Sequence, residues 1–399
     1  MRRIAAHYIF PISSPPIRNG IITLDDSGMV LNLSAPSEEL RESEGVEFYS
    51  GALAPGFVNA HCHLELSHLK GAIPQHTGLA GFIASLAAHR AAFSDEQARR
   101  AADLADAQLY ASGTVAIGDI SNSEVTFEVK SGSPVFYHTF IERFGLRRED
   151  VAPNVCMAQK LAAAAATLGL TASVTPHAPY STLPEMYEAL AQGGIWSIHN
   201  QESDDENLLF EKGEGALHEL FLSMGLTPLP PTGKPSIYHT LRHAAEGQRL
   251  LLVHNTYTSA TDYDAAAARC KNISWTLCPA SNLYIEHALP PLRMLRAKGA
   301  NIALGTDSLA SNASLNLLEE LKLLAKCFSD IPLSEMLRWA TLGGATALGR
   351  EHILGSFEKG KRPGVTLLSN LDLDKLKLTP ETKSRLLTRK IPTFADNFE

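Results

Sequence analysis

Short apolar runs alternate with longer amphipathic segments between about residue 57 and about residue 350. The short runs are rich in β-branched and aromatic residues, and eight of them predict strands. These runs are residues 57–61, 114–119, 135–140, 172–176, 196–199, 250–254, 273–278 and 301–307. Helical patterns lie between them, and one of these begins with a capping box, Ser94 to Gln97. Strands that alternate with helices form a parallel sheet, and eight such strands are enough to close a barrel.

The pattern changes at both ends of the chain. Residues 7–10, 20–24 and 29–33 read as short strands broken by Pro, Gly and Asp, and residues 365–371 read as another strand. We therefore predict an α/β protein with a (β/α)₈ TIM-like barrel at 56–351. The barrel interrupts one small β domain formed by 1–55 and 352–399. A barrel of this type takes ~250 residues, so the chain has room for both units.

Composition narrows the class of protein. Of the 399 residues, 45% are hydrophobic and 20% are charged, which is typical of a globular protein. The net charge of −8 and the absence of a basic run argue against nucleic acid as a partner. No apolar stretch approaches the ~18 residues of a membrane helix, so we expect no membrane partner either. We expect a small-molecule substrate, and a homodimer is one assembly that the sequence leaves open.

The cysteines indicate the compartment. The five cysteines are scattered without CxxC spacing, at positions 62, 156, 270, 278 and 327. An odd, dispersed set of this kind in a long chain favours a reducing environment over a disulfide framework. We therefore expect a cytoplasmic protein.

Histidines stand at the ends of several predicted strands. His61 and His63 close the first strand, His199 the fifth and His254 the sixth, and Asp307 ends the eighth. The C-terminal ends of barrel strands meet at one mouth, where catalytic groups lie. Imidazole and carboxylate are suitable ligands for Zn²⁺. A single histidine would be interpreted as a core or surface residue, but this set together predicts a metal site.

Glu202 lies three residues after His199. A glutamate beside a metal-activated water can act as a general acid or base. The alternative is a solvated loop acid, because Asp204, Asp205 and Glu206 follow at once. Only Glu202 has the spacing that places it near a ligand.

These motifs together resemble the amidohydrolase superfamily. The stretch 55–63 is similar to its first-strand signature, and the deaminase and chlorohydrolase branch is matched by four further motifs. They are His199 with Glu202, His254, Cys278-Pro-Ala-Ser-Asn282 and Gly305-Thr-Asp-Ser-Leu-Ala-Ser-Asn312. The resemblance implies a (β/α)₈ barrel with a composite β-sandwich from both termini. It also implies hydrolysis of a carbon–nitrogen or carbon–chlorine bond of a heterocycle.

The resemblance further implies the roles of the site residues. His61, His63, His199 and Asp307 would hold one divalent metal ion, Zn²⁺ with Fe²⁺ as the alternative, which activates a water. Glu202 would protonate a ring nitrogen, and His254 and Asp307 would accept the proton of the water. Binuclear members carry a lysine at the end of the fourth strand, where this chain has His177. One metal ion per chain is therefore expected.

A finer resemblance concerns the substrate. The stretches 61–67 and 81–83, with His89 and Arg90, are similar to aminodeoxyfutalosine deaminases of the alternative menaquinone route. This similarity predicts a 6-aminopurine nucleoside with a carboxylated aryl tail. The candidate substrate-binding residues are His177, Arg90, Glu65 and Asn282. The alternatives are a guanine or pterin deaminase, an S-adenosylhomocysteine deaminase, a chlorohydrolase or a non-catalytic barrel.

Overall fold

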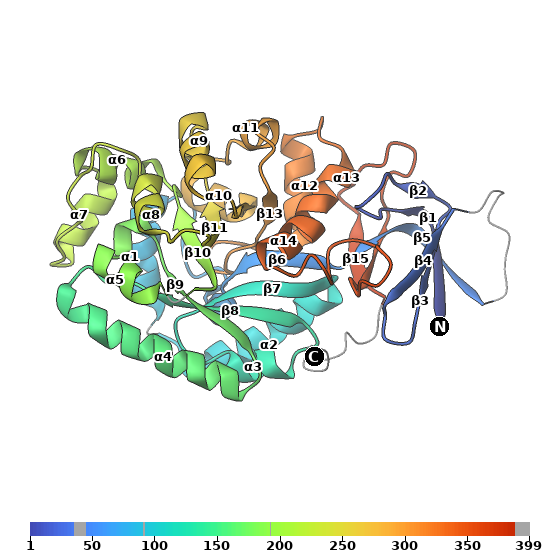
Figure 1. The fold of residues 1–399 in the computed structure, drawn as a ribbon, viewed down its shortest axis with the longest axis horizontal. Helices are drawn as coiled ribbons and strands as arrows, with labels where there is room; N and C mark the ends of the chain where they lie inside the picture. Colours follow the sequence, from blue (N-terminus) through green and yellow to red (C-terminus); the bar gives the residue numbers. More distant parts are fainter. Residues whose placement is uncertain (36–44, 91, 192, 388–399) are drawn as a thin grey trace.

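Eight parallel strands form the centre of the protein in the computed structural model, which describes residues 1–35, 45–90, 92–191 and 193–387 (Figure 1). Each predicted barrel strand is present, with shifts at the ends. The strands are β6 (Phe57–Cys62), β7 (Thr114–Ser121), β8 (Phe136–Arg143), β9 (Thr171–Pro176), β10 (Ile195–Asn200), β11 (Arg249–His254), β12 (Ile273–Leu277) and β13 (Ile302–Leu304).

Backbone hydrogen bonds join these strands into a ring. Strands β6 to β9 pair in sequence order, and so do β10 to β13. At one seam the His199 amide donates to the carbonyl of His177 at 2.9 Å. At the other seam the amides of Thr306 and Asp307 both donate to the carbonyl of His61, at 3.0 and 3.1 Å. Both seams lie at the C-terminal ends of the strands, so they also bring the predicted site residues together.

Helices surround the ring and connect its strands. Helix α2 begins as predicted, since Ser94 accepts from the Gln97 amide in a complete capping box. The helices that follow barrel strands are α1 (Gly78–Arg90), α2 (Asp95–Ala111), α3 (Phe127–Gly132), α4 (Val151–Thr167), α5 (Pro184–Leu190), α6 (Asp204–Lys212), α7 (Ala216–Ser223), α8 (Ile237–His243), α9 (Ala260–Arg269), α10 (Pro279–Glu286), α11 (Leu292–Ala297), α12 (Leu317–Cys327), α13 (Leu333–Arg338) and α14 (Gly344–Ala347). No helix among the described residues is long and apolar enough to cross a bilayer.

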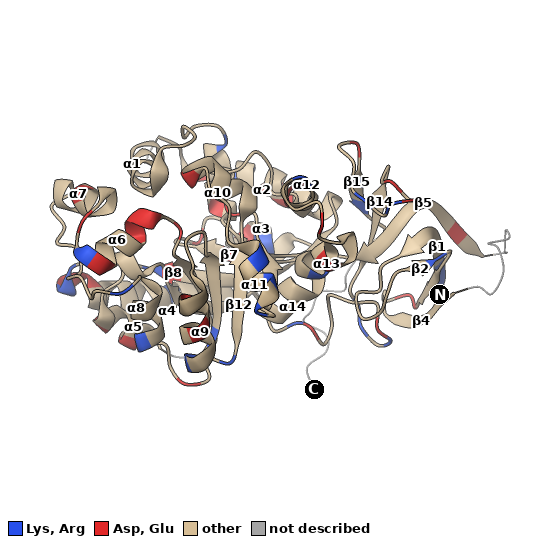
Figure 2. Ribbon diagram, turned by 90° about the horizontal axis from the view of Figure 1, so that it is seen from above, with Lys and Arg blue, Asp and Glu red and all other residues tan. Residues whose placement is uncertain are grey.

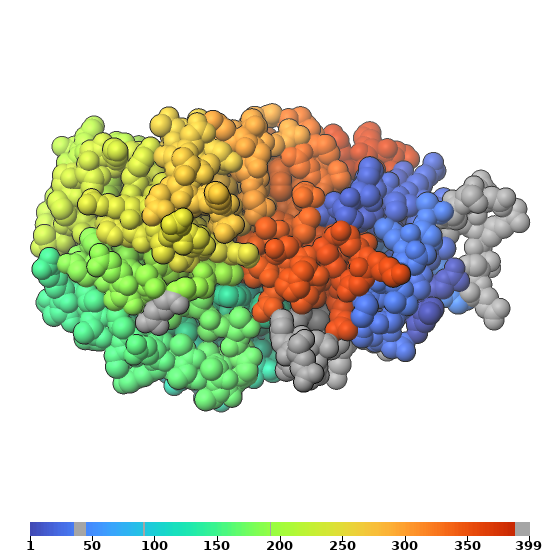
Figure 3. Space-filling model, in the orientation of Figure 1, coloured from blue at the N-terminus to red at the C-terminus, as the bar shows by residue number. Residues whose placement is uncertain are grey.

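The strands of both termini pair in one further sheet, as predicted. Its order is β15-β14-β5-β1-β3-β4, with β2 beside β1. These strands are β1 (Arg2–Ile9), β2 (Ile17–Arg18), β3 (Ile21–Leu24), β4 (Val30–Ser34), β5 (Val46–Pro55), β14 (Val365–Ser369) and β15 (Lys383–Leu386). Figure 3 shows the C-terminal segment in orange and red against the blue N-terminal part.

Two apolar cores explain this arrangement. One fills the terminal sheet with residues such as Ile4, Ile22 and Leu367. The other is larger and joins Phe10 and Leu368 of the terminal sheet to barrel residues such as Trp196, so the two units pack on each other. We propose domain limits of 1–55 with 352–399 and 56–351, because β5 ends at Pro55 and β6 begins at Phe57. Two segments of the proposed terminal domain, 36–44 and 388–399, lie outside the described residues.

Candidate metal centre and active site

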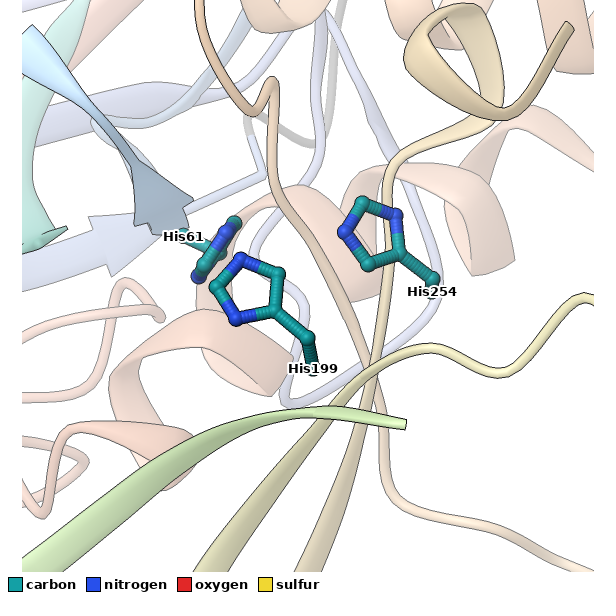
Figure 4. A group of neighbouring side chains, drawn as sticks. All are labelled: His61, His199 and His254. Atoms are coloured by element: carbon teal, nitrogen blue, oxygen red, sulfur yellow. The ribbon is translucent and has the colours of Figure 1, made fainter. Parts of the chain in front are cut away.

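Three imidazole rings converge at the mouth of the barrel. His61 is the second-last residue of β6, His63 follows the strand directly, and His199 lies near the end of β10 (Figure 4 shows His61 and His199 with His254). The Nε2 atom of His63 lies 3.0 Å from Nε2 of His61 and 3.2 Å from Nε2 of His199. Burial lowers the pKa of His61 and of His199 well below the usual value, so both rings are neutral and offer a lone pair.

Asp307 brings a carboxylate to the same point. Its Oδ1 atom lies 3.4 Å from Nε2 of His63 and 3.8 Å from Nε2 of His61. The other oxygen, Oδ2, accepts hydrogen bonds from the hydroxyls of Ser281 and Ser311, both at 2.6 Å. Burial alone would raise the pKa of Asp307, but the His63 and His254 rings and the two hydroxyls lower it to about 2. One anionic oxygen therefore faces the histidines.

This donor set fits a divalent ion of the zinc class. Ligand atoms at Zn²⁺ distances of about 2.1 Å are about 3.4 Å apart in a tetrahedron, close to the separations seen here. The Nδ1 atom of His199 faces the carbonyl of His177 at 3.1 Å. A proton on Nδ1 completes this hydrogen bond and leaves Nε2 as the ligand atom. Neighbouring neutral nitrogen lone pairs repel one another, and a cation between them removes that repulsion.

The surroundings of His254 favour the acceptance of a proton at its Nε2 atom. Its Nδ1 atom lies 2.8 Å from Oδ1 of Asn282, whose Nδ2 donates to the Thr256 hydroxyl. The orientation of this amide therefore places the imidazole proton on Nδ1. The Nε2 atom is buried and has no hydrogen-bond partner among the described residues. His254 also has a backbone φ of +71°, an unfavourable value for a residue with a Cβ that is common at functional sites.

Glu202 lies beside His254. One carboxyl oxygen is 3.7 Å from Nε2 of His254, and the residue is only 5% exposed, so Glu202 is not a solvated loop acid. Burial raises the pKa of the Glu202 carboxyl well above its usual value, and the charge of Asp307 raises it further. The site therefore favours the protonated form, which can donate to a ring nitrogen.

The four candidate substrate-binding residues have different surroundings. His177 is half-buried, its ring centroid is 4.6 Å from that of His199, and Nδ1 lies 2.6 Å from the Ser181 hydroxyl. Arg90 pairs with Glu65 at 2.7 Å and keeps 42% of its side chain exposed. The second oxygen of Glu65 is held by the amides of Asn122 and Ser123. The Asn282 side chain bonds His254 and Thr256, so its first contact is with the proposed base.

A buried ion pair supports the first histidine strand, and the sequence analysis did not identify it. Nζ of Lys130 lies 2.5 Å from Oδ2 of Asp119, and both side chains are fully buried. The other oxygen of Asp119 accepts the amide of Leu64, the residue after His63, at 2.8 Å. A lysine in an amphipathic segment gives no sequence signal for such a contact. The pair fixes the chain at the point where the second histidine leaves the strand.

We expect Lys130→Met to destabilise the protein by about 3–5 kcal/mol, because it leaves the Asp119 carboxylate buried without its cation. Urea unfolding followed by circular dichroism measures this change. The matched control is Lys298→Met, which removes a partly exposed pair with Asp264 and should cost at most about 1 kcal/mol. Equal effects of the two substitutions would show that Asp119 does not depend on Lys130.

Comparison with known proteins identifies the family of the chain. The chain matches the amidohydrolase family over residues 52–392, and it belongs to that family. The family is metal-dependent, and the relatives of this chain in it include deaminases. The predicted enzyme class, a hydrolase that acts on carbon–nitrogen bonds, and the predicted barrel are thereby confirmed.

Three individual relatives are more specific than the family as a whole. The chain is 29% identical to 5-methylthioadenosine/S-adenosylhomocysteine deaminase of Teredinibacter turnerae, over 85% of this chain and 77% of that protein. It is 26% identical to an adenosine deaminase of Helicobacter pylori, over 80% and 79%. The crystal structure of Helicobacter pylori aminofutalosine deaminase with methylthio-coformycin has the same fold, with a TM-score of 0.81 at 23% identity over 97% of this chain and 98% of that chain.

Proposed function

We propose that the protein is a metal-dependent deaminase that hydrolyses the 6-amino group of an adenine nucleoside and releases ammonia. One observation carries this proposal. The Glu202 carboxyl and the unprotonated Nε2 of His254 lie 3.7 Å apart, beside the four donors His61, His63, His199 and Asp307. An acid and a base on the two sides of one activated water are what hydrolytic deamination requires.

The residues divide the proton transfers between them. A divalent ion held by His61, His63, His199 and Asp307, with Zn²⁺ as our proposal, supplies an activated water when bound. Glu202 donates its proton to the ring nitrogen next to the amino-bearing carbon, which makes that carbon electrophilic. His254 holds the water at Nε2 and accepts its proton, and Asp307 assists. His254 then passes its proton to the amino group, which leaves as ammonia when its bond to the ring carbon breaks, and the remaining hydroxyl proton returns to Glu202.

The substrate class has two sources of support. The two curated relatives described above carry names of deaminases of adenosine and its 5′-substituted forms. The stretch from His61 to Ser67 and the pair His89 and Arg90 resemble aminodeoxyfutalosine deaminases. We therefore propose aminodeoxyfutalosine as the substrate. S-adenosylhomocysteine, 5-methylthioadenosine and adenosine are the alternatives.

A substrate panel tests the proposal. The purified protein is incubated with aminodeoxyfutalosine, S-adenosylhomocysteine, 5-methylthioadenosine, adenosine, guanine and a chlorinated triazine, and product is followed by ammonia or chloride release. We expect the highest kcat/KM on aminodeoxyfutalosine. A preference for another adenine nucleoside would support the deaminase activity but contradict aminodeoxyfutalosine as the substrate. Turnover of guanine or the triazine alone, or of nothing, would contradict the proposed function.

We expect Arg90→Ala to lower kcat/KM for aminodeoxyfutalosine about 10–150-fold, because a charge-assisted hydrogen bond to a carboxylate contributes about 1.5–3 kcal/mol. The guanidinium is partly exposed and is already oriented by Glu65, so it can meet the carboxylated tail of the substrate. Steady-state kinetics on aminodeoxyfutalosine and on adenosine measure the effect. Adenosine has no such tail, and its turnover should hardly change.

The control for this variant is Arg99→Ala. Arg99 lies on α2, forms an exposed ion pair with Glu128 and should be neutral on both substrates. An equal loss on the two substrates in Arg90→Ala would exclude Arg90 from a tail pocket. It would indicate instead that the bond to Glu65 shapes the whole site.

A further inference from the structure

The turn that carries Glu202 has an unfavourable backbone. Gln201 lies between the β10 strand and Glu202 and has a φ of +45°. Such a conformation costs of order 1–3 kcal/mol for a residue with a side chain, and it persists only where neighbouring groups hold it. The side-chain amide of Gln201 is held by hydrogen bonds with Thr258, Asn207 and Asp262. The backbone N–H groups of the turn need separate partners, because they lie outside the strand ladder.

Glu206 supplies these partners. Oε1 of Glu206 accepts the Gln201 amide at 3.0 Å, and Oε2 accepts the Glu202 amide at 2.9 Å. The Ser236 hydroxyl donates to Oε1 at 2.5 Å. Glu206 is fully buried, and no ion pair among the described residues involves it. Asp204, on the same turn of α6, is exposed.

The position of Glu206 in α6 makes this geometry unusual. Figure 2 shows the acidic first turn of α6 in red, and Ser203 caps the helix by accepting the Glu206 amide at 3.1 Å. In an ordinary capping box the acid at this position binds the amide of the capping residue itself. Here the side chain reaches past Ser203 to the two preceding amides. The side-chain bonds of Glu206 therefore serve the turn before the helix.

We propose that Glu206 is a positioning residue that fixes the turn from Gln201 to Glu202, and with it the place of the Glu202 carboxyl relative to His254 and the substrate. This inference deepens the proposed function and rests on the role of Glu202 as the acid. The two backbone bonds of Glu206 are the only ones that the described structure gives to these two amides. Loss of either hydrogen bond leaves the backbone amide of Gln201 or of Glu202 without a partner, and the turn that positions Glu202 is then free to move.

The test is Glu206→Gln, which keeps the shape of the side chain but turns one oxygen into an N–H donor. That donor faces a backbone N–H, and one buried amide loses its partner. We expect kcat to fall about 5–100-fold, with KM changed less than about threefold and metal content unchanged. Glu211→Gln on the exposed side of the same helix is the matched control and should match wild type.

A double-mutant cycle separates positioning from a general structural role. If Glu206 acts through Glu202, then Glu206→Gln added to Glu202→Gln should lower the residual rate less than about twofold. The same loss in both backgrounds, or wild-type kcat in Glu206→Gln, would overturn the inference. Near-normal turnover of Glu202→Gln alone would instead contradict the proposed function, so the two failures are distinct.

A milder variant covers the case in which Glu206→Gln does not fold. Ser236→Ala removes the hydroxyl that donates to the Glu206 carboxylate at 2.5 Å and also lies 3.4 Å from Oδ1 of Asn207, and it leaves both backbone bonds of Glu206 in place. We expect this variant to fold and to lose about two- to fivefold in kcat, again only when Glu202 is present. No change in kcat, or the same loss with Glu202→Gln, would count against the inference.

Discussion

Replacement of His61 by alanine is expected to abolish both metal binding and activity. The Nε2 atom of His61 lies 3.0 Å from that of His63 and 3.8 Å from Oδ1 of Asp307, so it shares one centre with both. Removal of one of the four proposed donors leaves an incomplete donor set and an open space in the buried site, so the ion should be lost during purification. Elemental analysis of the purified protein should give about one divalent ion per wild-type chain and none in His61→Ala.

The control for the metal experiment is His352→Ala, since His352 is exposed and remote in sequence from the site. This variant should retain both metal and activity. Two ions per wild-type chain would contradict the mononuclear assignment, and a full complement of metal in His61→Ala would exclude His61 as a ligand. Analysis of zinc and iron together also tests the proposed Zn²⁺.

Replacement of Glu202 by glutamine is expected to lower kcat at least about 10²-fold, and up to about 10⁴-fold, which is the usual contribution of a general acid. Glutamine fills the same space beside His254 but has no proton of suitable acidity. Metal content should be unchanged, because Glu202 is not one of the proposed ligands. Steady-state kinetics and elemental analysis of the same preparation give both quantities.

Asp204→Asn is the matched control, because Asp204 is a nearby acid on the same segment and its side chain is exposed. It should have wild-type kinetics. Near-normal turnover by Glu202→Gln would exclude Glu202 as the acid and leave ring protonation to another group. Loss of metal in Glu202→Gln would mean that the carboxyl belongs to the metal centre.

The sequence predicted the barrel because its signals are local. Apolar runs such as 250–254 are buried on both sides in a parallel barrel, and their short length and continuous apolar content identify them without tertiary information. The same is true of the strand ends. His61, His199 and His254 could be grouped before the structure was known, because parallel strands bring their C-terminal ends to one mouth.

Distances and orientations of the site were decided only by tertiary packing. The sequence identified Asn282 as a candidate for substrate binding, but the fold places its amide against Nδ1 of His254, where it sets the tautomer. It also identified Arg90 and Glu65 separately, and only the approach of α1 to the mouth pairs them. Such contacts join residues far apart in the chain, so no local pattern encodes them.

The chain by itself therefore determined which residue types stand at which strand ends, because strand periodicity and barrel polarity are properties of local sequence. The tertiary structure alone decided which of the acids act on the turn after β10. Glu202, Asp204 and Glu206 are similar in the sequence, yet one faces His254, one faces solvent and one holds two backbone amides. The difference arises from burial and direction, which depend on how α6 packs against Ser236 and the barrel.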